Sequence, residues 1–210
     1  MNKPNPAEII KHHDYDPSLV DRVATKTSNL SHVFVIEDPN PSWPAHFQTF
    51  KSAIEEALGP SSCLEVRHVG STSIPGLPAK PIIDMDVIVA DIQGEDSYRP
   101  QLEAIGIEMR NREPSWHQHR LFHARKSEKW LMDGTLHVWG DGCPEVERHA
   151  IFREWIMGHE EDRELYIQIK REAMKATKEE GGNMLRYNSK KEKVVREILD
   201  RAFRARGLME

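Results

Sequence analysis

A short turn followed by a strand with two carboxylates is the feature that most restricts how this chain can fold. Gly70 and Ser71 follow one strand candidate, and a second, residues 81–89, carries Asp84 and Asp86 at alternate positions. Side chains alternate along a strand, so both aspartates are predicted to lie on one face, roughly 7 Å apart along the backbone. The intervening side chains are apolar and are predicted to be buried on the other face: Ile83, Met85, Val87 and Val89.

Two carboxylates held side by side repel each other, so a fold that keeps them is expected to place a cation between them. Mg²⁺ suits this position because it prefers hard oxygen ligands and completes its octahedron with waters and substrate phosphates. The adjacent turn offers backbone N–H groups and hydroxyls that can hold phosphate oxygens. A Gly-Ser turn beside a strand with the pattern Asp-x-Asp is typical of nucleotidyltransferase active sites. An edge strand with two solvated aspartates is the alternative interpretation.

The stretch from His68 to Asp84 reads HVGSTSIPGLPAKPIID and resembles the signature of the GrpB family. Shorter segments extend the resemblance over about residues 32–205: Pro41–Phe47, Arg120–Phe122, Leu136–Val138, Phe152–Trp155 and Tyr187–Lys191. The resemblance implies a polymerase-β-like nucleotidyltransferase fold. It implies less about the reaction, because the biochemical role of the family is poorly defined and some members are joined to a dephospho-CoA kinase domain.

Length and charge narrow the class of protein further. A chain of 210 residues predicts one domain, or one domain with a helical appendage. The net charge of −5 argues against a nucleic-acid-binding surface, and no apolar run approaches the ~20 residues that span a bilayer. The N-terminus lacks the apolar core of a secretory signal, and Cys63 and Cys143 have no metal-site spacing. We therefore expect a reduced, cytoplasmic protein.

The order of the predicted elements indicates an α+β (mixed α/β) fold in which a mixed sheet precedes a helical bundle. Residues 1–31 are polar and are predicted to form a flexible or loosely docked extension of the domain at 32–205. The sheet core covers about residues 32–142, and a helical part, about 143–205, is expected to close over one side of the site. The predicted strands span 33–36, 63–69, 81–89, 107–110, 120–124 and 135–138. The predicted helices lie between Ser42 and Gly59 and over 98–105, 145–157, 160–179 and 183–205.

The aspartate pair lacks a clear third carboxylate, which normally completes such a metal site. Asp84 and Asp86 are the predicted metal ligands, and His137 stands on a neighbouring strand candidate where an acid would be expected. His137 can ligate a metal, act as a general base or bind phosphate, and a structural role in the strand is the alternative. We expect the two carboxylates to raise its pKa in the absence of metal. Glu113 is the other candidate for the third acid.

Several groups are candidates for holding phosphate. Ser71, Thr72 and Ser73 offer hydroxyls next to Gly70, although turn formation and helix capping explain such residues equally well. Two cations are predicted near the site on strands, with solvated side chains as the alternative: Lys80 at the start of the second strand and Arg120 on a later one.

The helical part supplies two further pairs at the spacing i, i+4, which places both members of a pair on one helix face. Tyr166 pairs with Lys170 and Tyr187 pairs with Lys191, so an aromatic and a basic side chain from each helix are predicted to lean over the nucleotide. The alternative is a solvated helix face with packed tyrosines.

Histidines at 117, 119 and 123 raise the possibility of a zinc site. The first two would share a face of a strand, but there is no cysteine partner and a third ligand would have to come from elsewhere. Surface strands that carry histidines are more common than such sites, so we do not predict zinc. His12 and His13 are expected to titrate in solvent.

The leading hypothesis is a Mg²⁺-dependent, nucleotidyltransferase-like enzyme that transfers a nucleotidyl group from a nucleoside triphosphate to a small-molecule acceptor. A non-catalytic module that binds a nucleotide or coenzyme A is the first alternative, because the third carboxylate is missing and some relatives are fused to dephospho-CoA kinase. A metal-dependent hydrolase or phosphotransferase that uses the same site, with His137 positioning water, is the second.

Overall fold

A six-stranded mixed sheet forms the frame of the molecule in the computed structural model, which describes residues 2–24 and 34–210. The strands are β1 (Asp21–Arg22), β2 (Cys63–Val69), β3 (Ile82–Val89), β4 (Ile107–Glu113), β5 (His119–Ala124) and β6 (Asp133–Gly140). Their order across the sheet is β1-β4-β5-β6-β3-β2. The pair β3 and β6 is parallel and the other pairs are antiparallel, so the predicted mixed sheet is confirmed.

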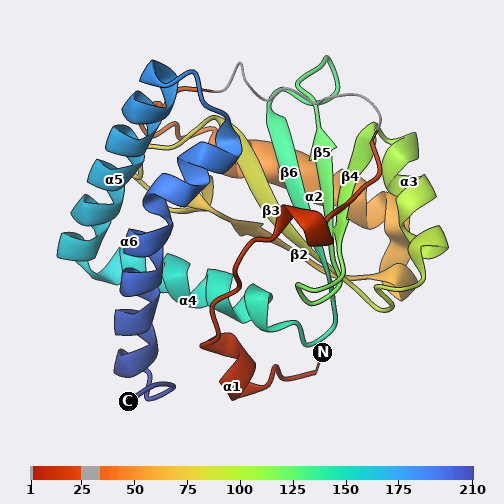
Figure 1. Cartoon of the computed structure of the whole chain (residues 1–210). Coiled ribbons are helices and arrows are strands. Elements are labelled where there is room, and N and C mark those ends of the chain that lie inside the picture. The colour runs from red at the N-terminus through yellow and green to blue at the C-terminus, as the bar shows by residue number, and fades with distance from the viewer. Residues whose placement is uncertain (1, 25–33) are drawn as a thin grey trace.

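Helices surround this sheet in two groups (Figure 1). The helices are α1 (Pro6–Ile9), α2 (Trp43–Ser62), α3 (Arg99–Ala104), α4 (Pro144–Gly158), α5 (Glu160–Glu179) and α6 (Met184–Ala205). The first group, α2 and α3, packs on the apolar face of the sheet. The second group, α4, α5 and α6, forms the predicted C-terminal bundle beside β2 and β3.

The apolar face of the sheet forms the main core. Phe47, Phe50, Ile54 and Leu58 recur at helical spacing on α2 and are all buried. They meet apolar side chains of the sheet, which alternate with polar ones: Ile83, Met85, Val87, Val89, Phe122, Leu136 and Val138. Gly59, with φ +67°, interrupts the regular helix where the sequence predicted its end. The alternation on β3 leaves its aspartates on the opposite face.

The N-terminal segment, predicted as a flexible or loosely docked extension over residues 1–31, packs on the domain where it is described, and residues 1 and 25–31 lie outside the described residues. Residues 2–24 lie along the domain, where Ile9 is buried among side chains of α4 and α6. Arg148 donates a hydrogen bond to the backbone oxygen of Ile9 (2.6 Å), and His12 contacts Asp200 (2.9 Å). The strand β1 then adds to the edge of the sheet beside β4. Scattered apolar residues are therefore enough to anchor this polar segment.

The strand predicted at 33–36 begins outside the described residues, and 34–36 form no strand. Instead, Glu37 makes an isolated antiparallel bridge with Ala79. None of the helices in the described ranges is long and apolar enough to cross a membrane.

Candidate functional site

The turn between β2 and β3 approaches Asp84 closely. Gly70 has φ +65°, and a Cβ atom at this position would lie 2.5 Å from Oδ2 of Asp84. Only glycine combines this backbone conformation with such a close approach. The turn therefore requires glycine at position 70.

The hydroxyl groups of Ser71, Thr72 and Ser73 in the turn make different contacts. Ser71 Oγ lies 3.2 Å from the hydroxyl of Tyr166 and 3.4 Å from Nζ of Lys170, so it faces the helical bundle. Thr72 donates to the backbone oxygen of Ile82 (3.1 Å), and Ser73 donates to that of Gly70 (2.7 Å). Ser71 therefore remains a candidate phosphate ligand, whereas the side chains of Thr72 and Ser73 stabilise the turn, as the alternative interpretation predicted.

Asp84 is placed between the sheet and cationic side chains. Its carboxylate accepts a hydrogen bond from Thr135 on β6, and Lys80 and Lys191 are the cations that act most strongly on it. Burial raises the pKa of Asp84, while these two lysines lower it. The carboxylate thus lies in a partly buried, positively charged environment.

The two tyrosine–lysine pairs of the bundle face this site, as predicted. Lys80 and Lys191 both lie over the ring of Tyr187, with Nζ 5.3 and 5.5 Å from the ring centre. Lys170 Nζ lies 4.5 Å from the centre of the Tyr166 ring. These are distances at which an ammonium group is attracted to the face of an aromatic ring. We refer to Lys80, Lys170 and Lys191 as the lysine cluster.

Positive charge exceeds negative charge in the lysine cluster. Burial and, after it, the nearby cations, led by Lys191, together lower the pKa of Lys170 to about 7. Burial likewise lowers the pKa of Lys80 to about 8, despite Asp84. Glu192 lies near Lys191 but is exposed and binds Arg196. The arrangement is short of negative charge, which a bound anion would supply.

Asp86 shares its sheet face with Asp84, as predicted, but its surroundings differ. It is fully buried, and its carboxylate accepts a hydrogen bond from Nε1 of Trp139 (2.9 Å). Nδ1 of His149, on α4, lies 2.8 Å from the other carboxylate oxygen. Both oxygens are therefore occupied by side-chain nitrogens.

The contacts of the Asp86 carboxylate affect how Asp84 and Asp86 could bind the predicted Mg²⁺ ion. Trp139 and His149 contact both oxygens of Asp86, so a cation between the two aspartates would have to share these oxygens with them. In residues 2–24 and 34–210, no three His, Cys, Asp or Glu side chains gather as a metal-binding group. The magnesium ion stays a prediction.

His137 lies opposite Asp86 in the parallel pairing of β3 and β6, but its environment differs from the expected one. Its Nδ1 is 3.0 Å from Nε2 of His119, and burial together with His119 and His149 lowers its pKa well below the ordinary value. The expected rise in pKa is therefore wrong, because burial and the neighbouring histidines determine the shift. Its catalytic role stays a prediction. Glu113 lies 3.4 Å from Nδ1 of His119, on the far side of that histidine from His137.

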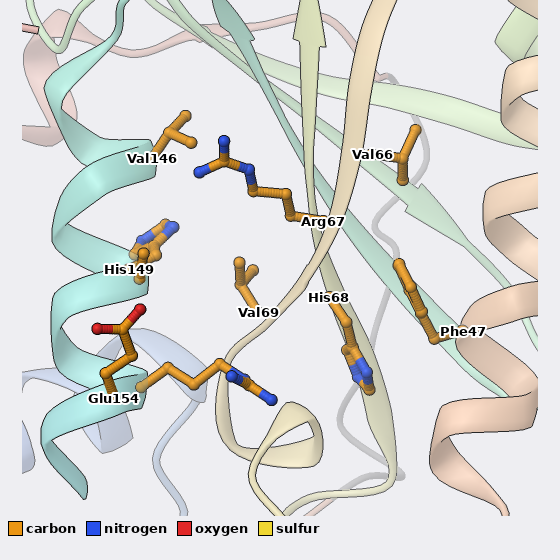
Figure 2. Close-up of a pocket in the computed structure, with 10 residues that line it drawn as sticks. Phe47, Val66, Arg67, His68, Val69, Val146, His149 and Glu154 are labelled. Atoms are coloured by element: carbon orange, nitrogen blue, oxygen red, sulfur yellow. The ribbon is translucent and has the colours of Figure 1, made fainter. Parts of the chain in front are cut away.

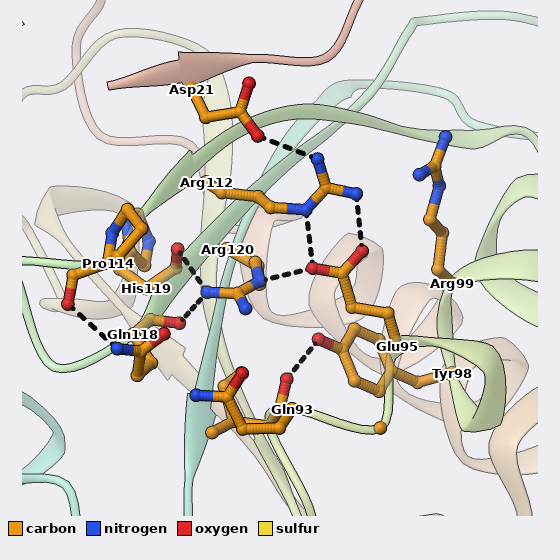
Figure 3. A network of polar contacts seen from close by, with 12 residues as sticks. Asp21, Gln93, Glu95, Tyr98, Arg99, Arg112, Pro114, Gln118, His119 and Arg120 are labelled. Carbon is orange, nitrogen blue, oxygen red and sulfur yellow. Dashed lines mark hydrogen bonds and ion pairs between the residues drawn. The ribbon is translucent and has the colours of Figure 1, made fainter. Parts of the chain in front are cut away.

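Arg120 is not part of this site, which corrects our prediction. It pairs with Val138 of the buried core face across β5 and β6, so its side chain lies on the opposite side of the sheet from Asp84. There, Nε of Arg120 donates to Glu95 (2.6 Å), which also binds Arg112 (2.6 and 2.7 Å), as Figure 3 shows. Arg112 in turn binds Asp21 (2.9 Å). Arg120 contributes to a structural ion-pair network.

The histidine-rich segment before β5 forms a turn. His117 and Gln118 have positive φ (49° and 59°), so the face-sharing needed for a zinc pair at 117 and 119 does not arise. Sequence reasoning also missed His149, which contacts Asp86 although it lies 63 residues away along the chain. An isolated histidine in a helix carries no signal of such a contact.

The comparisons with known proteins agree with this fold. The family model described as GrpB protein matches residues 33–201. A UPF0157 protein of Halalkalibacterium halodurans is 39% identical over 163 residues, 78% of this chain and 79% of that protein. The crystal structure of conserved protein GrpB from Enterococcus faecalis superposes with a TM-score of 0.68 at 25% identity, over 82% of this chain and 99% of that chain.

A more distant similarity involves a protein named dephospho-CoA kinase. The protein with this name from Mycolicibacterium paratuberculosis is 26% identical over 186 residues, which is 79% of this chain but 45% of that protein. The family match and the UPF0157 relative together cover most of the chain. The chain therefore belongs to the GrpB family.

Proposed function

We propose that this protein binds the phosphate groups of a nucleotide at the lysine cluster and that the lysines, rather than a two-aspartate magnesium centre, carry the compensating charge. The observation that supports this most strongly is Lys170, which is 2% exposed and whose charged neighbours are all cations. A buried ammonium group without a carboxylate partner is unfavourable unless an anion compensates it. A polyphosphate is an anion of suitable charge and size.

The other groups at the site fit such a ligand. Ser71 Oγ lies near Lys170 and can donate a hydrogen bond to a phosphate oxygen. Tyr166 and Tyr187 are buried beside the lysines.

The choice of a nucleotide rests on the comparisons rather than on base-specific contacts. The family fold is consistent with the nucleotidyltransferase-like superfamily, and a protein named dephospho-CoA kinase matches most of this chain over 45% of its own length. Both point to a ligand with linked phosphates, such as a nucleoside triphosphate or dephospho-CoA.

Magnesium-dependent nucleotidyl transfer to a small acceptor is the second candidate. It is favoured by the common face of Asp84 and Asp86 and by the close approach of Gly70 to Asp84. For this reaction, Asp86 would have to ligate the metal beside its contacts with Trp139 and His149.

Isothermal calorimetry with ATP, CTP, GTP, UTP, dephospho-CoA and tripolyphosphate, each in EDTA and in Mg²⁺, separates the two candidates. We expect binding of at least one of these ligands in EDTA, and its loss in Lys170→Met. Lys175→Met, on an exposed position of the same helix, is the matched control and should bind normally. Binding that requires Mg²⁺ and is lost in Asp86→Asn would instead favour the transferase. The absence of binding under both conditions would contradict both candidates.

A further inference from the structure

A pocket lies between β2 and α4, apart from the lysine cluster (Figure 2). Its volume is about 250 Å³, and its apolar wall includes Phe47, Val66 and Val146. Ligand pockets for drug-sized molecules usually span about 300–1,000 Å³, so this one suits a smaller molecule. None of the functions predicted from the sequence uses it.

His149 lines this pocket, and a contact with Asp86 fixes the orientation of its ring. Its Nδ1 contacts the buried carboxylate of Asp86, which Trp139 also binds. No described residue forms a hydrogen bond with Nε2, the ring nitrogen on the other side. Although burial lowers the pKa of His149, Asp86 and Glu145 raise it to about 8. The ring is therefore oriented, and Nε2 is available as a donor to a ligand.

Two guanidinium groups complete the polar part of the pocket. Arg67 reaches it from β2 and is paired with Glu65 outside, and Arg153 reaches it from α4. The carboxylate on the pocket wall, Glu154, is exposed and engaged by Arg206. Of the charged side chains that line the pocket, Arg67, His149 and Arg153 are cationic and Glu154 is acidic, while Glu147 also acts on Arg67 from nearby.

We propose that this pocket is a second ligand site, which binds a small molecule with one anionic group and an apolar body. The anionic group, a phosphate or a carboxylate, would be received by Nε2 of His149 and the guanidinium groups of Arg67 and Arg153. The apolar body would lie against Val69 and Val146, which line the pocket on the same side of β2 as Arg67 and His149. Asp86 is a positioning residue in this arrangement, because it acts through His149.

The same turn separates this pocket from the lysine cluster. Ser71 faces the lysines, while Thr72 contacts His68 (3.0 Å) and the backbone oxygen of Ser73 accepts from Arg153 (3.2 Å). Two ligands could therefore lie on either side of residues 70–73. Ligand binding in the pocket between β2 and α4 does not depend on the lysine cluster. The inference would rest on the proposed function only if the ligand in this pocket were the acceptor of a group transferred from the nucleotide.

The test is a ¹⁵N-histidine NMR titration of the full chain in EDTA, with phenyl phosphate, benzoate and inorganic phosphate as probes. The ring signals of His149 are identified by their loss in His149→Gln. We expect a saturable shift of these signals with phenyl phosphate or benzoate, and weaker binding of inorganic phosphate, which lacks the apolar body. A stronger response to phenyl phosphate than to benzoate assigns a phosphate ligand, and the reverse assigns a carboxylate.

Variants then locate the site. Arg67→Gln and Arg153→Gln should each weaken binding of the preferred probe by about tenfold, as expected for a charge-assisted hydrogen bond. Arg99→Gln, an arginine in an exposed pair on the other side of the sheet, should leave it unchanged. Lys170→Met should also leave the affinity of this probe unchanged. The outcome of this test is therefore independent of whether the lysine cluster binds a nucleotide. No saturable His149 shift in the unmodified protein, or a shift that neither arginine variant weakens, would overturn the inference.

Discussion

Arg120 and Lys170 are both buried cations, yet their surroundings are opposite in kind. Arg120 is 4% exposed and donates to Glu95, which also binds Arg112. Lys170 is 2% exposed, donates to the backbone oxygen of Pro78 and lies among cations. The first region carries its own counter-charges, whereas the second lacks them.

This difference separates a structural network from a candidate ligand site. Where guanidinium groups and carboxylates meet within hydrogen-bond distance, the folded chain itself compensates the cost of burial. Where lysines gather around one carboxylate, the compensation has to come from outside the chain or from loss of a proton. The comparison predicts opposite effects when each region is disrupted.

The largest effect is expected in the compensated network. Glu95→Gln leaves Arg112 and Arg120 without their shared carboxylate, so it should lower the free energy of unfolding by about 3 kcal/mol. Urea unfolding measures this change. Glu103→Gln, in an exposed pair with Arg99, should change stability by less than about 1 kcal/mol. Equal effects of the two substitutions would remove the basis for calling the Glu95 network structural.

Lys170→Met should act in the opposite direction. Removing an uncompensated buried charge should raise the melting temperature by about 2–4 °C, since 1 kcal/mol corresponds to such a shift in a chain of this size. The same substitution should weaken polyphosphate binding by at least about tenfold. Thermal melts and calorimetry measure the two changes, with Lys175→Met as control. A less stable variant that binds polyphosphate normally would contradict the comparison.

Ser71→Ala should give the smallest effect. It removes one hydroxyl near Lys170 and Tyr166, so polyphosphate binding should weaken by about 1–2 kcal/mol while stability changes little. Calorimetry compares it with Ser52→Ala, a change at an exposed position of α2. Unchanged affinity in Ser71→Ala would restrict the site to the lysines.

Local patterns predicted most of the fold. The strand at 63–69 and the helix at 160–179 have the predicted bounds, because apolar periodicity and glycine signals define both. The pairs at the spacing i, i+4 also placed Tyr166 with Lys170 and Tyr187 with Lys191 on inward faces. These features depend on the geometry of one element at a time.

The errors in the predicted site have a different origin. Arg120 shares the face of Phe122 on the same strand, and alternation with that apolar residue was the available signal that it faces the core. The contact of His149 with Asp86 depends on how α4 crosses the sheet, which no local pattern specifies. The sequence therefore showed the aspartate pair but not that the oxygens of Asp86 are occupied.

The most direct test of the central claim is the number of protons exchanged when tripolyphosphate binds in EDTA at pH 8. With the pKa of Lys170 at about 7 and that of Lys80 at about 8, both are partly deprotonated in the free protein at this pH. A bound polyanion favours their charged forms, so binding should take up about one proton or more, and affinity should fall as the pH rises from 7 to 9. Calorimetry in two buffers of different ionisation enthalpy measures this uptake. Proton uptake in EDTA that is smaller in Lys170→Met is the predicted result; binding that occurs only with Mg²⁺, or without proton uptake, would contradict the account.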